Sequence, residues 1–133
     1  MTRRYFVFLA FTLCAGASCS TPPAAPPEKA PDENAAIEAL EAVNQAQQDF
    51  IRRTRRYALT YDELVRDYLL KEKPTSETTG YDVILKPSPD AVSYTIIATP
   101  RSDAEKFRHF FTDKTGVIRA ETGRAATAES PEM

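Results

Sequence analysis

The longest regular alternation of apolar and polar residues runs from Asn34 to Tyr57. Apolar positions recur there at alternating steps of four and three residues, which is the period of an α-helix rather than of a β-strand. Acidic and amide side chains at 32–34 favour a helix N-terminus, and four arginines within 52–56 favour a C-terminus. The pattern therefore predicts one long amphipathic helix over 34–57. Its apolar stripe consists of Ala36, Leu40, Val43, Gln47, Phe50, Thr54 and Tyr57, widened by Ile37 and Ile51.

A second, shorter helix is predicted soon after the first. Thr60 followed three residues later by Glu63 has the form of a capping box, in which each side chain bonds to the other residue's backbone N–H. Pro74 ends the helical pattern because proline cannot donate a backbone hydrogen bond. The apolar side of this helix consists of Leu64, Val65, Tyr68 and Leu69. The polar segment 75–80 is predicted to be a mobile loop.

From residue 81 onward a two-residue alternation replaces the helical period. It predicts strands over 81–86, 92–99, 107–112 and 117–120, and the first two should pair as an antiparallel hairpin. The side chains expected on the shared face of this hairpin are Tyr81, Val83, Leu85, Val92, Tyr94, Ile96 and Ala98. Residues 121–133 are expected to form either a tail or a loop laid back on the sheet. The predicted fold class is α+β, with the long N-terminal helix packed across a three- to four-stranded antiparallel sheet.

The length and the composition fit one such domain. The chain has 133 residues, of which 42% are hydrophobic and 27% charged, as in ordinary globular domains. The net charge of −2 gives no electrostatic case for a nucleic-acid partner. We interpret the arginines of 52–56, the main basic cluster, as a solvated helix end rather than a phosphate or anionic-lipid site.

The first nineteen residues have the pattern of a secretory signal peptide. Arg3 and Arg4 form a positive segment, residues 5–13 form an apolar segment, and small residues then lead to Cys19. The apolar run is too short to span a bilayer as a helix. The run Ala-Gly-Ala-Ser-Cys at 15–19 resembles the bacterial lipoprotein box, although Gly16 stands where that box has a leucine. The resemblance implies lipidation of Cys19; the alternative is simple cleavage near Ser18.

A proline-rich segment follows the signal peptide. Residues 20–33 contain five prolines and favour an extended, unpacked chain, so we interpret them as a tether rather than as a ligand for another domain. Both cysteines of the chain, Cys14 and Cys19, lie ahead of this tether. A disulfide within the folded domain is therefore not expected.

Residues able to carry catalytic or metal chemistry are sparse. The single histidine, His109, is interpreted as a strand-face residue, since neither a second histidine nor a recognisable nucleophile motif accompanies it. Gly80, Gly116 and Gly123 are isolated, so no phosphate-binding loop is expected. We assign the scattered aspartates to turns rather than to calcium, and the tyrosines to the core and its rim. These residues are Asp82, Asp90, Asp103 and Asp113, and Tyr57, Tyr61, Tyr68, Tyr81 and Tyr94.

The order of these elements resembles the globular part of a type IV pilin or type II secretion pseudopilin, over residues 34–131. The helix AAIEALEAVNQAQQDF is similar to the exposed half of the pilin helix, and YALTYDELVRDYLL to the segment that follows it. GYDVIL and SYTIIATP are similar to the first two strands of the family, and HFFTDKTGVIR to its last strand pair. The resemblance implies a pilin-like α+β domain.

The resemblance does not extend to the N-terminus of a prepilin. A prepilin carries a short basic leader, a glutamate at the fifth mature position and a long apolar half-helix that forms the filament core, whereas the first acidic residue here is Glu28. We therefore expect a pilin-like head with a lipid in place of the apolar stalk, and an isolated domain that is monomeric at micromolar concentration.

Together these features predict a non-enzymatic cell-envelope lipoprotein that is a structural or interaction component of a type IV pilus or type II secretion-like apparatus. The alternative is a stand-alone envelope module that binds a peptide or an envelope polymer. A lipid on Cys19 would contact the membrane. Ser20 favours the outer membrane, because it replaces the aspartate associated with inner-membrane retention in many Gram-negative lipoproteins. No cofactor, metal or nucleic acid is expected, and the expected protein partner belongs to the pilus or secretion assembly.

Overall fold

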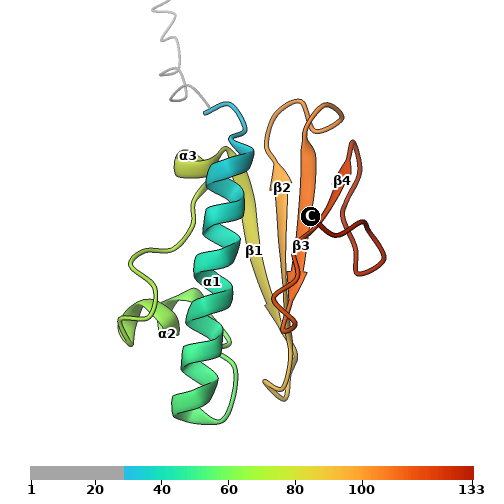
Figure 1. The fold of residues 1–133 in the computed structure, drawn as a ribbon. Coiled ribbons are helices and arrows are strands. Elements are labelled where there is room, and N and C mark those ends of the chain that lie inside the picture. The colour runs from blue at the N-terminus through green and yellow to red at the C-terminus, as the bar shows by residue number, and fades with distance from the viewer. Residues whose placement is uncertain (1–28) are drawn as a thin grey trace, which may run out of the picture.

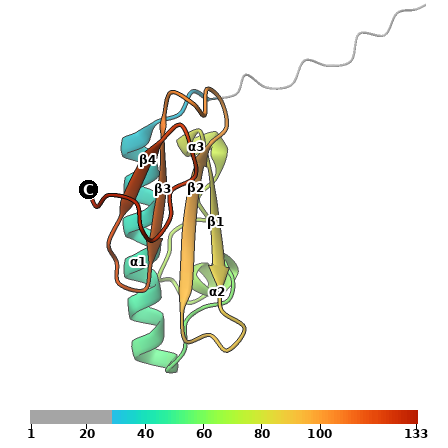
Figure 2. The same cartoon turned by 90° about the vertical axis from the view of Figure 1, so that its right-hand side faces the viewer.

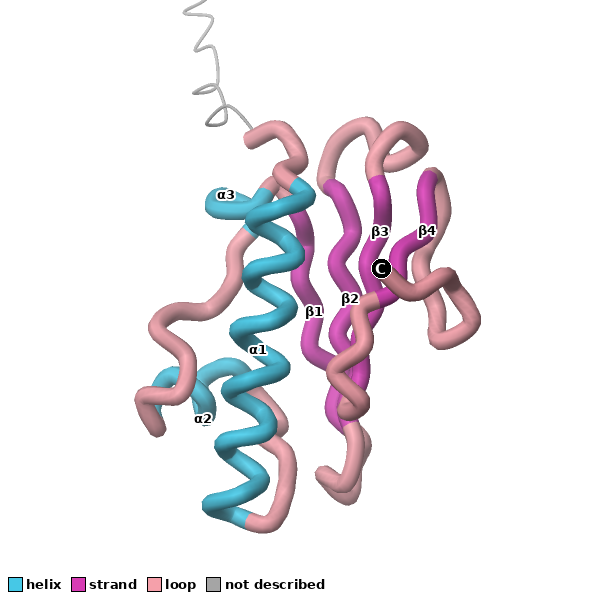
Figure 3. Tube along the Cα trace, in the orientation of Figure 1, coloured by secondary structure: helices cyan, strands magenta, loops and turns pink. Residues whose placement is uncertain are grey.

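The computed structural model describes residues 29–133, which form an α+β fold (Figure 1). Four strands make one antiparallel sheet in the order β1-β2-β3-β4 (Figure 3), and the long helix α1 shares a core with it. The fold class predicted from the sequence is therefore confirmed at this level. The elements are α1 Glu33–Thr54, α2 Tyr61–Arg66, α3 Ser76–Thr79, β1 Tyr81–Pro87, β2 Tyr94–Pro100, β3 Arg108–Asp113 and β4 Arg119–Thr122.

Helix α1 begins one residue before the predicted start and ends three residues before the predicted end. Asp32 is the N-cap, and its side chain accepts a hydrogen bond from the N–H of Ala35 at 3.1 Å. Arg55 adopts a left-handed conformation with φ 66°, and its N–H donates to the carbonyl of Ile51. The prediction that Tyr57 belongs to the helix is wrong, because the left-handed Arg55 turns the chain away from the helix axis.

The predicted stripe of α1 faces the core along most of its length. Ala36, Leu40, Val43, Gln47 and Phe50 are all buried, and Asn44 and Ala46 are buried beside them. Thr54 is exposed, in contrast to the prediction, and its hydroxyl donates to the carbonyl of Phe50. Tyr57 still reaches the core from the segment after the helix, where its ring packs edge-on against Tyr94.

The predicted hairpin of β1 and β2 is confirmed. In its register Ile84 lies opposite Ile97, and Tyr81 lies opposite Pro100. Tyr94, Ile96 and Ala98 are buried on the predicted face, with Tyr81 and Val83 beside them on β1. Val92 does not follow the prediction: it is 60% exposed, because β2 begins only at Tyr94 and Val92 belongs to the turn.

Segment 75–80 contains a helical turn, α3, where the sequence predicted a loop. Gly80 ends α3 with φ 73°, and its N–H donates to the carbonyl of Ser76 at 2.7 Å. The chain ahead of α1 packs on this turn: the N–H of Asp32 donates to Thr79, and the Lys29 ammonium donates to the carbonyl of Thr78. The last residues of the predicted tether 20–33 are therefore part of the folded domain.

Helix α2 begins at the predicted N-cap. Thr60 Oγ1 accepts from the N–H of Glu63 at 3.3 Å, which is half of the predicted capping box. The other half differs, because the Glu63 carboxylate accepts from the N–H of Leu59 instead of Thr60. The helix ends at Arg66, so Tyr68, predicted on its apolar side, lies outside it and is 96% exposed.

The C-terminal residues lie back along the outer edge of β4. The N–H of Ala120 donates to the carbonyl of Pro131, and the N–H of Met133 donates to the carbonyl of Ile118, both at 3.0 Å. Arg119 adds an ion pair to Glu132 at 2.7 Å. Of the two expectations for residues 121–133, the structure therefore shows the segment laid back on the sheet.

Candidate binding groove

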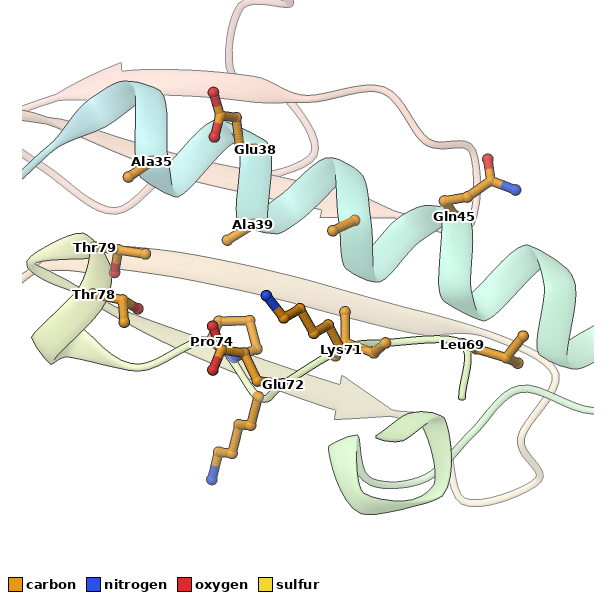
Figure 4. Close-up of a pocket in the computed structure, with 13 residues that line it drawn as sticks. Ala35, Glu38, Ala39, Gln45, Leu69, Lys71, Glu72, Pro74, Thr78 and Thr79 are labelled. Atoms are coloured by element: carbon orange, nitrogen blue, oxygen red, sulfur yellow. The ribbon is translucent and has the colours of Figure 1, made fainter. Parts of the chain in front are cut away.

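A largely apolar groove lies between α1 and the segment 69–79 (Figure 4). It has a volume of about 450 Å³ and runs along the side of α1 that does not face the sheet. Its lining residues are Ala35, Glu38, Ala39, Ala42 and Gln45 from α1, and Leu69, Leu70, Lys71, Glu72, Lys73, Pro74, Thr78 and Thr79 from the facing segment.

The spacing of small residues on α1 makes one side of the groove smooth. Ala35, Ala39 and Ala42 recur at steps of four and three, so that they lie above one another on the same side of the helix. Alanine leaves the backbone of a helix accessible, because its side chain is a single methyl group. This side of the groove therefore offers apolar contact without a large side chain in the way.

The opposite side consists of the irregular stretch 69–75 and of α3, and it is attached to the core at Leu70. Leu70 is buried, and its N–H and that of Leu69 both donate to the carbonyl of Leu64 at the end of α2. Pro74 follows before α3 and restricts the backbone of the preceding residue. The buried Leu70 and the hydrogen bonds to Leu64 thus fix the start of this segment beside α1.

The charged side chains around the groove are of both signs. Glu38 lies on α1, and Lys71, Glu72 and Lys73 lie on the facing segment. In Figure 4 the Lys71 side chain extends from the segment into the space between it and α1. Lys73 places its ammonium 5.8 Å from the centre of the Tyr61 ring. The groove therefore combines an apolar lining with ion-pairing groups at its rim, a combination that suits a peptide-like ligand.

Hydrogen bonds in the core fix α1, and with it the groove, relative to the sheet. Asn44 Nδ2 donates to Thr112 Oγ1 at 2.9 Å, and the Tyr94 hydroxyl donates to Asn44 Oδ1 at 3.0 Å. Burial raises the pKa of the Tyr94 hydroxyl above its usual range, so this tyrosine stays protonated. Removing Asn44 would take a hydrogen-bond partner from the buried Thr112 hydroxyl, at a cost of about 1–3 kcal/mol.

A second buried amide ties α1 to the chain that follows it. Gln47 Nε2 donates to the carbonyl of Ala58 at 3.1 Å, and Gln47 Oε1 accepts from the N–H of the same residue at 2.9 Å. This paired contact explains why a polar residue occupies a fully buried position of the stripe. It also fixes the start of the segment that leads through α2 to the groove.

Two ion pairs link segments that are far apart in the sequence or in different elements. Glu33 at the start of α1 accepts from Arg108 of β3, at 2.7 Å to Nη2, and this hydrogen bond lowers the pKa of Glu33. Arg56 donates to Glu63 at 2.6 Å, and this contact lowers the pKa of Glu63 to about 2. Both carboxylates are therefore ionised at neutral pH, with a charged partner in place.

The structure does not gather the residues considered for chemistry into one site. His109 is buried in β3, as expected for a strand-face residue, with Nε2 at 2.9 Å from the carbonyl oxygen of Ala104. Asp90 and Asp113 accept hydrogen bonds within their own turns, from Ser88 and Thr115. Asp103 pairs with Lys106 at 2.9 Å. Asp82 lies on the exposed face of β1, 3.8 Å from Arg101 Nε. In the described part of the chain, no three His, Cys, Asp or Glu side chains are grouped as a metal site.

The arginines and tyrosines have separate positions. Arg52 pairs with Asp49, Arg55 is the C-cap of α1, and Arg56 turns back to Glu63 and stacks over the Phe50 ring. The four arginines therefore do not form a single continuous cationic patch. Tyr57, Tyr61, Tyr81 and Tyr94 are buried, as the interpretation of core and rim aromatics required, whereas Tyr68 is almost fully exposed and does not follow it.

The groove was not predicted from the sequence. The alanines at 35, 39 and 42 were the available signal, but alanine is common on exposed helix faces and does not by itself indicate a ligand. Cys19, the predicted lipid attachment residue, lies outside the described residues. Between residues 29 and 133 there is no helix with the length and apolar composition needed to cross a lipid bilayer.

Comparisons of the chain with protein-family models, with characterised proteins and with solved structures gave no match.

Proposed function

We propose that this chain is a non-enzymatic lipoprotein of the cell envelope, and that its domain is a pilin-like structural or interaction component of a type IV pilus or type II secretion-like apparatus. A lipid on Cys19 attaches it to a membrane, with the outer membrane favoured over the inner. In this proposal α1 corresponds to the exposed half of the pilin helix and is packed across the sheet.

The observation that carries the proposal is the order of elements, a long helix followed by a short helix and an antiparallel meander. The contacts of α1 with the sheet support it, since Asn44 bonds to β2 and β3 and the side chains of Leu40 and Phe50 lie in the same core as Ile96. The pilin part of the proposal rests on the sequence resemblance, because the fold alone is compatible with many functions.

We propose that the interaction takes place in the groove. A partner segment with apolar side chains would bury the methyl groups of α1 and the exposed parts of Leu69, while its charged ends would meet Glu38 and Lys71. In an envelope apparatus, such a segment would belong to a pilin or secretion component whose own stalk remains in the membrane.

The test uses the full-length protein, isolated from envelope extracts of its native host after cross-linking in the cells. Ala42 is exposed on α1 and lines the groove, so Ala42→Arg fills the groove while keeping a good helix former at that position. Ala128→Arg is the matched control, because Ala128 is exposed in a turn outside this groove.

We expect the wild type and Ala128→Arg to recover pilus or secretion components, and Ala42→Arg to lose them. Recovery of unrelated envelope proteins with none of these components, or equal recovery by all three proteins, would contradict the proposal.

The alternative is a stand-alone binding module, and the groove also favours this reading because its volume suits a short peptide. If this alternative is correct, we expect the purified domain alone to bind peptides or envelope polymer fragments, and Ala42→Arg to abolish this binding. Titration calorimetry with both ligand classes separates the alternatives, since an apparatus component requires a specific protein partner.

A further inference from the structure

β1 is an edge strand, and the hydrogen bonds around it show which of its backbone groups point away from the sheet. The N–H of Arg101 donates to the carbonyl of Gly80, one step beyond the first pair of the β1–β2 register. Hydrogen-bonded and non-hydrogen-bonded pairs alternate in an antiparallel ladder. The even-numbered residues of β1 therefore bond to β2, and the odd-numbered residues point outward. The hydrogen bond from the Tyr61 hydroxyl to the carbonyl of Val83, at 3.2 Å, agrees with this assignment.

The protein covers only part of this outer edge. Thr79 Oγ1 accepts from the N–H of Tyr81 at 3.0 Å and donates to its carbonyl at 3.1 Å. Tyr61 occupies one lone pair of the Val83 carbonyl. Among the described residues, the N–H of Val83 and both backbone groups of Leu85 have no hydrogen-bond partner. A hollow of about 400 Å³ borders Val83 and Leu85, and residues 59–62 and Lys73 also line it.

The other edge of the same sheet is covered at the start of β4. The N–H of Ala120 in β4 and the carbonyl of Ile118 just before it bond to residues 131 and 133, and an isolated bridge pairs Arg119 with Glu132. Figure 2 shows β1 and β4 at opposite margins of the sheet, with α1 behind it. Natural proteins usually protect both edges of a sheet, so an open stretch on one edge indicates a place for another strand.

The exposed face of β1 carries a distinctive row of side chains. Asp82, Ile84 and Lys86 alternate there with the odd-numbered residues, and Ile84 is 48% exposed. The register places Ile84 beside Ile97 and Ile97 beside Phe111, so an apolar row runs across three strands and ends at the open edge. The row stops at Ile84 because β1 is the last strand on this side of the sheet.

We propose that two copies of this chain pair edge to edge through β1, antiparallel, with Ile84 on the two-fold axis. In this register the N–H of Val83 donates to the carbonyl of the partner's Leu85, and the partner's Leu85 N–H donates to the Val83 carbonyl, which has a second lone pair. The two-fold axis repeats both bonds. The N–H of Val83 and both backbone groups of Leu85 are then hydrogen-bonded.

Charge complementarity selects a second copy as the occupant. With Ile84 on the axis, Asp82 lies opposite the partner's Lys86, and Lys86 lies opposite the partner's Asp82. The two apolar rows also meet at Ile84 and become continuous. Centring the pair on Val83 or Leu85 would instead place Ile84 opposite a charged residue, so the sequence of β1 favours this one register. Asp82 lies 3.8 Å from Arg101 at the surface, a weak ion pair that does not occupy the carboxylate fully.

The interface is small, because one short strand of each copy contributes to it. Stable complexes bury larger surfaces, so the domain is monomeric in dilute solution and pairs where copies are concentrated. Attachment to a membrane raises the local concentration of the domain in this way. That last step depends on the proposed lipid anchor, whereas the pairing itself does not.

Disulfide trapping tests the register. The fragment 20–133 keeps every described residue and contains neither natural cysteine, so Ile84→Cys introduces a single thiol. Residues on the axis form a non-hydrogen-bonded pair with Cα atoms about 4.5 Å apart, inside the roughly 4.4–6.8 Å range of disulfides. We expect Ile84→Cys to form covalent dimers under mild oxidation, faster as the protein concentration rises. Val92→Cys, an exposed apolar position in the turn after β1, is the matched control and should form few dimers.

Charge reversal adds an independent test in the Ile84→Cys background. Lys86→Asp turns both attractive pairs into repulsive ones, and we expect trapping to fall by roughly tenfold. The double change Asp82→Lys with Lys86→Asp exchanges the charges and should restore trapping. Thermal melting of each variant identifies any loss of folding. The proposal is overturned if Ile84→Cys forms dimers no faster than Val92→Cys, or if the folded double exchange traps no better than Lys86→Asp.

Discussion

Phe50 is the side chain on which the core depends most directly. Its ring is buried between α1 and the sheet, and the Arg56 guanidinium lies 5.1 Å from its centre. The Phe50 ring fills part of the core and also stacks against Arg56. It therefore contacts both the hydrophobic interior and the chain at the end of α1. The neighbouring Gln48 is not suitable as a control for substitution, because its side-chain Nε2 donates a hydrogen bond to the carbonyl of Lys114 at 3.3 Å.

Phe50→Ala should therefore destabilise the domain by about 3–5 kcal/mol, through lost burial and the cavity that remains. Denaturant unfolding of the fragment 20–133 measures the change. Glu41→Ala is the control, because Glu41 is exposed on α1, and it should leave the free energy of unfolding nearly unchanged. A Phe50→Ala protein as stable as the control would show that the stripe does not face the core.

The ion pair between Arg56 and Glu63 predicts how stability depends on acidity. The folded-state pKa of Glu63 is lowered to about 2 from an ordinary value of 4.5, because the carboxylate accepts hydrogen bonds from Arg56 and from the backbone. The stabilisation is therefore fully present above about pH 4.5 and is lost as the pH falls toward 2. Glu33, whose pKa is also lowered, contributes in the same direction.

The melting temperature of the wild type should fall over this acidic range, and Glu63→Gln should melt lower at neutral pH with a shallower fall. Parallel curves for the two proteins would show that the pair adds no pH-dependent stability.

At the scale of elements, the local patterns predicted the type and order of both longer helices and all four strands. The end of α1 was missed because Arg55 adopts a left-handed conformation that glycine or asparagine usually signals. α3 was missed because serine and threonine are weak helix formers. Contacts with residues 29–32, distant in sequence, accompany it.

The groove and the arrangement of the C-terminus could not be predicted from local sequence patterns for the same reason. Each depends on segments that meet only after folding: Ala39 faces the segment around Lys71, and Ala120 binds Pro131. Gln47 illustrates a partial success. The period placed it on the buried stripe, but the backbone of Ala58 that satisfies it was not identifiable from spacing.

Gly80 lies at the junction of α3 and β1, where a side chain larger than hydrogen has little room. A Cβ at this position would lie 2.5 Å from the carbonyl oxygen of Ala30 and 2.7 Å from Cα of Pro31, in addition to the strain of φ 73°. Gly80→Ala should therefore displace the chain that leads into α1. Gly116→Ala is the matched control, because Gly116 has φ 77° and open space around it.

Both variants carry the left-handed strain of about 1–2 kcal/mol, so the additional loss in Gly80→Ala measures the backbone contact. We expect Gly80→Ala to unfold at clearly lower denaturant concentration than Gly116→Ala. Equal midpoints would mean that residues 30–31 do not pack on Gly80.

At the scale of the whole molecule, lipidation of Cys19 can be tested separately from the proposed function of the domain. Labelling of cells with a fatty-acid analogue should mark the wild type and leave Cys19→Ala unmarked, because the thiol of Cys19 is the proposed acceptor. Cys14→Ala should remain marked, since Cys14 lies within the predicted signal peptide. Equal labelling of the wild type and Cys19→Ala, or no labelling of either, would contradict lipidation.

The most direct test of the proposed function compares pilus assembly and protein secretion in the native host with and without this protein. Strains carry no copy, the wild type, Cys19→Ala or Ala42→Arg, with equal protein levels confirmed by immunoblotting. We predict that surface pili or secreted substrate are lost without the protein and in both variants, and return with the wild type. Normal pili and normal secretion in the strain without any copy would contradict the account.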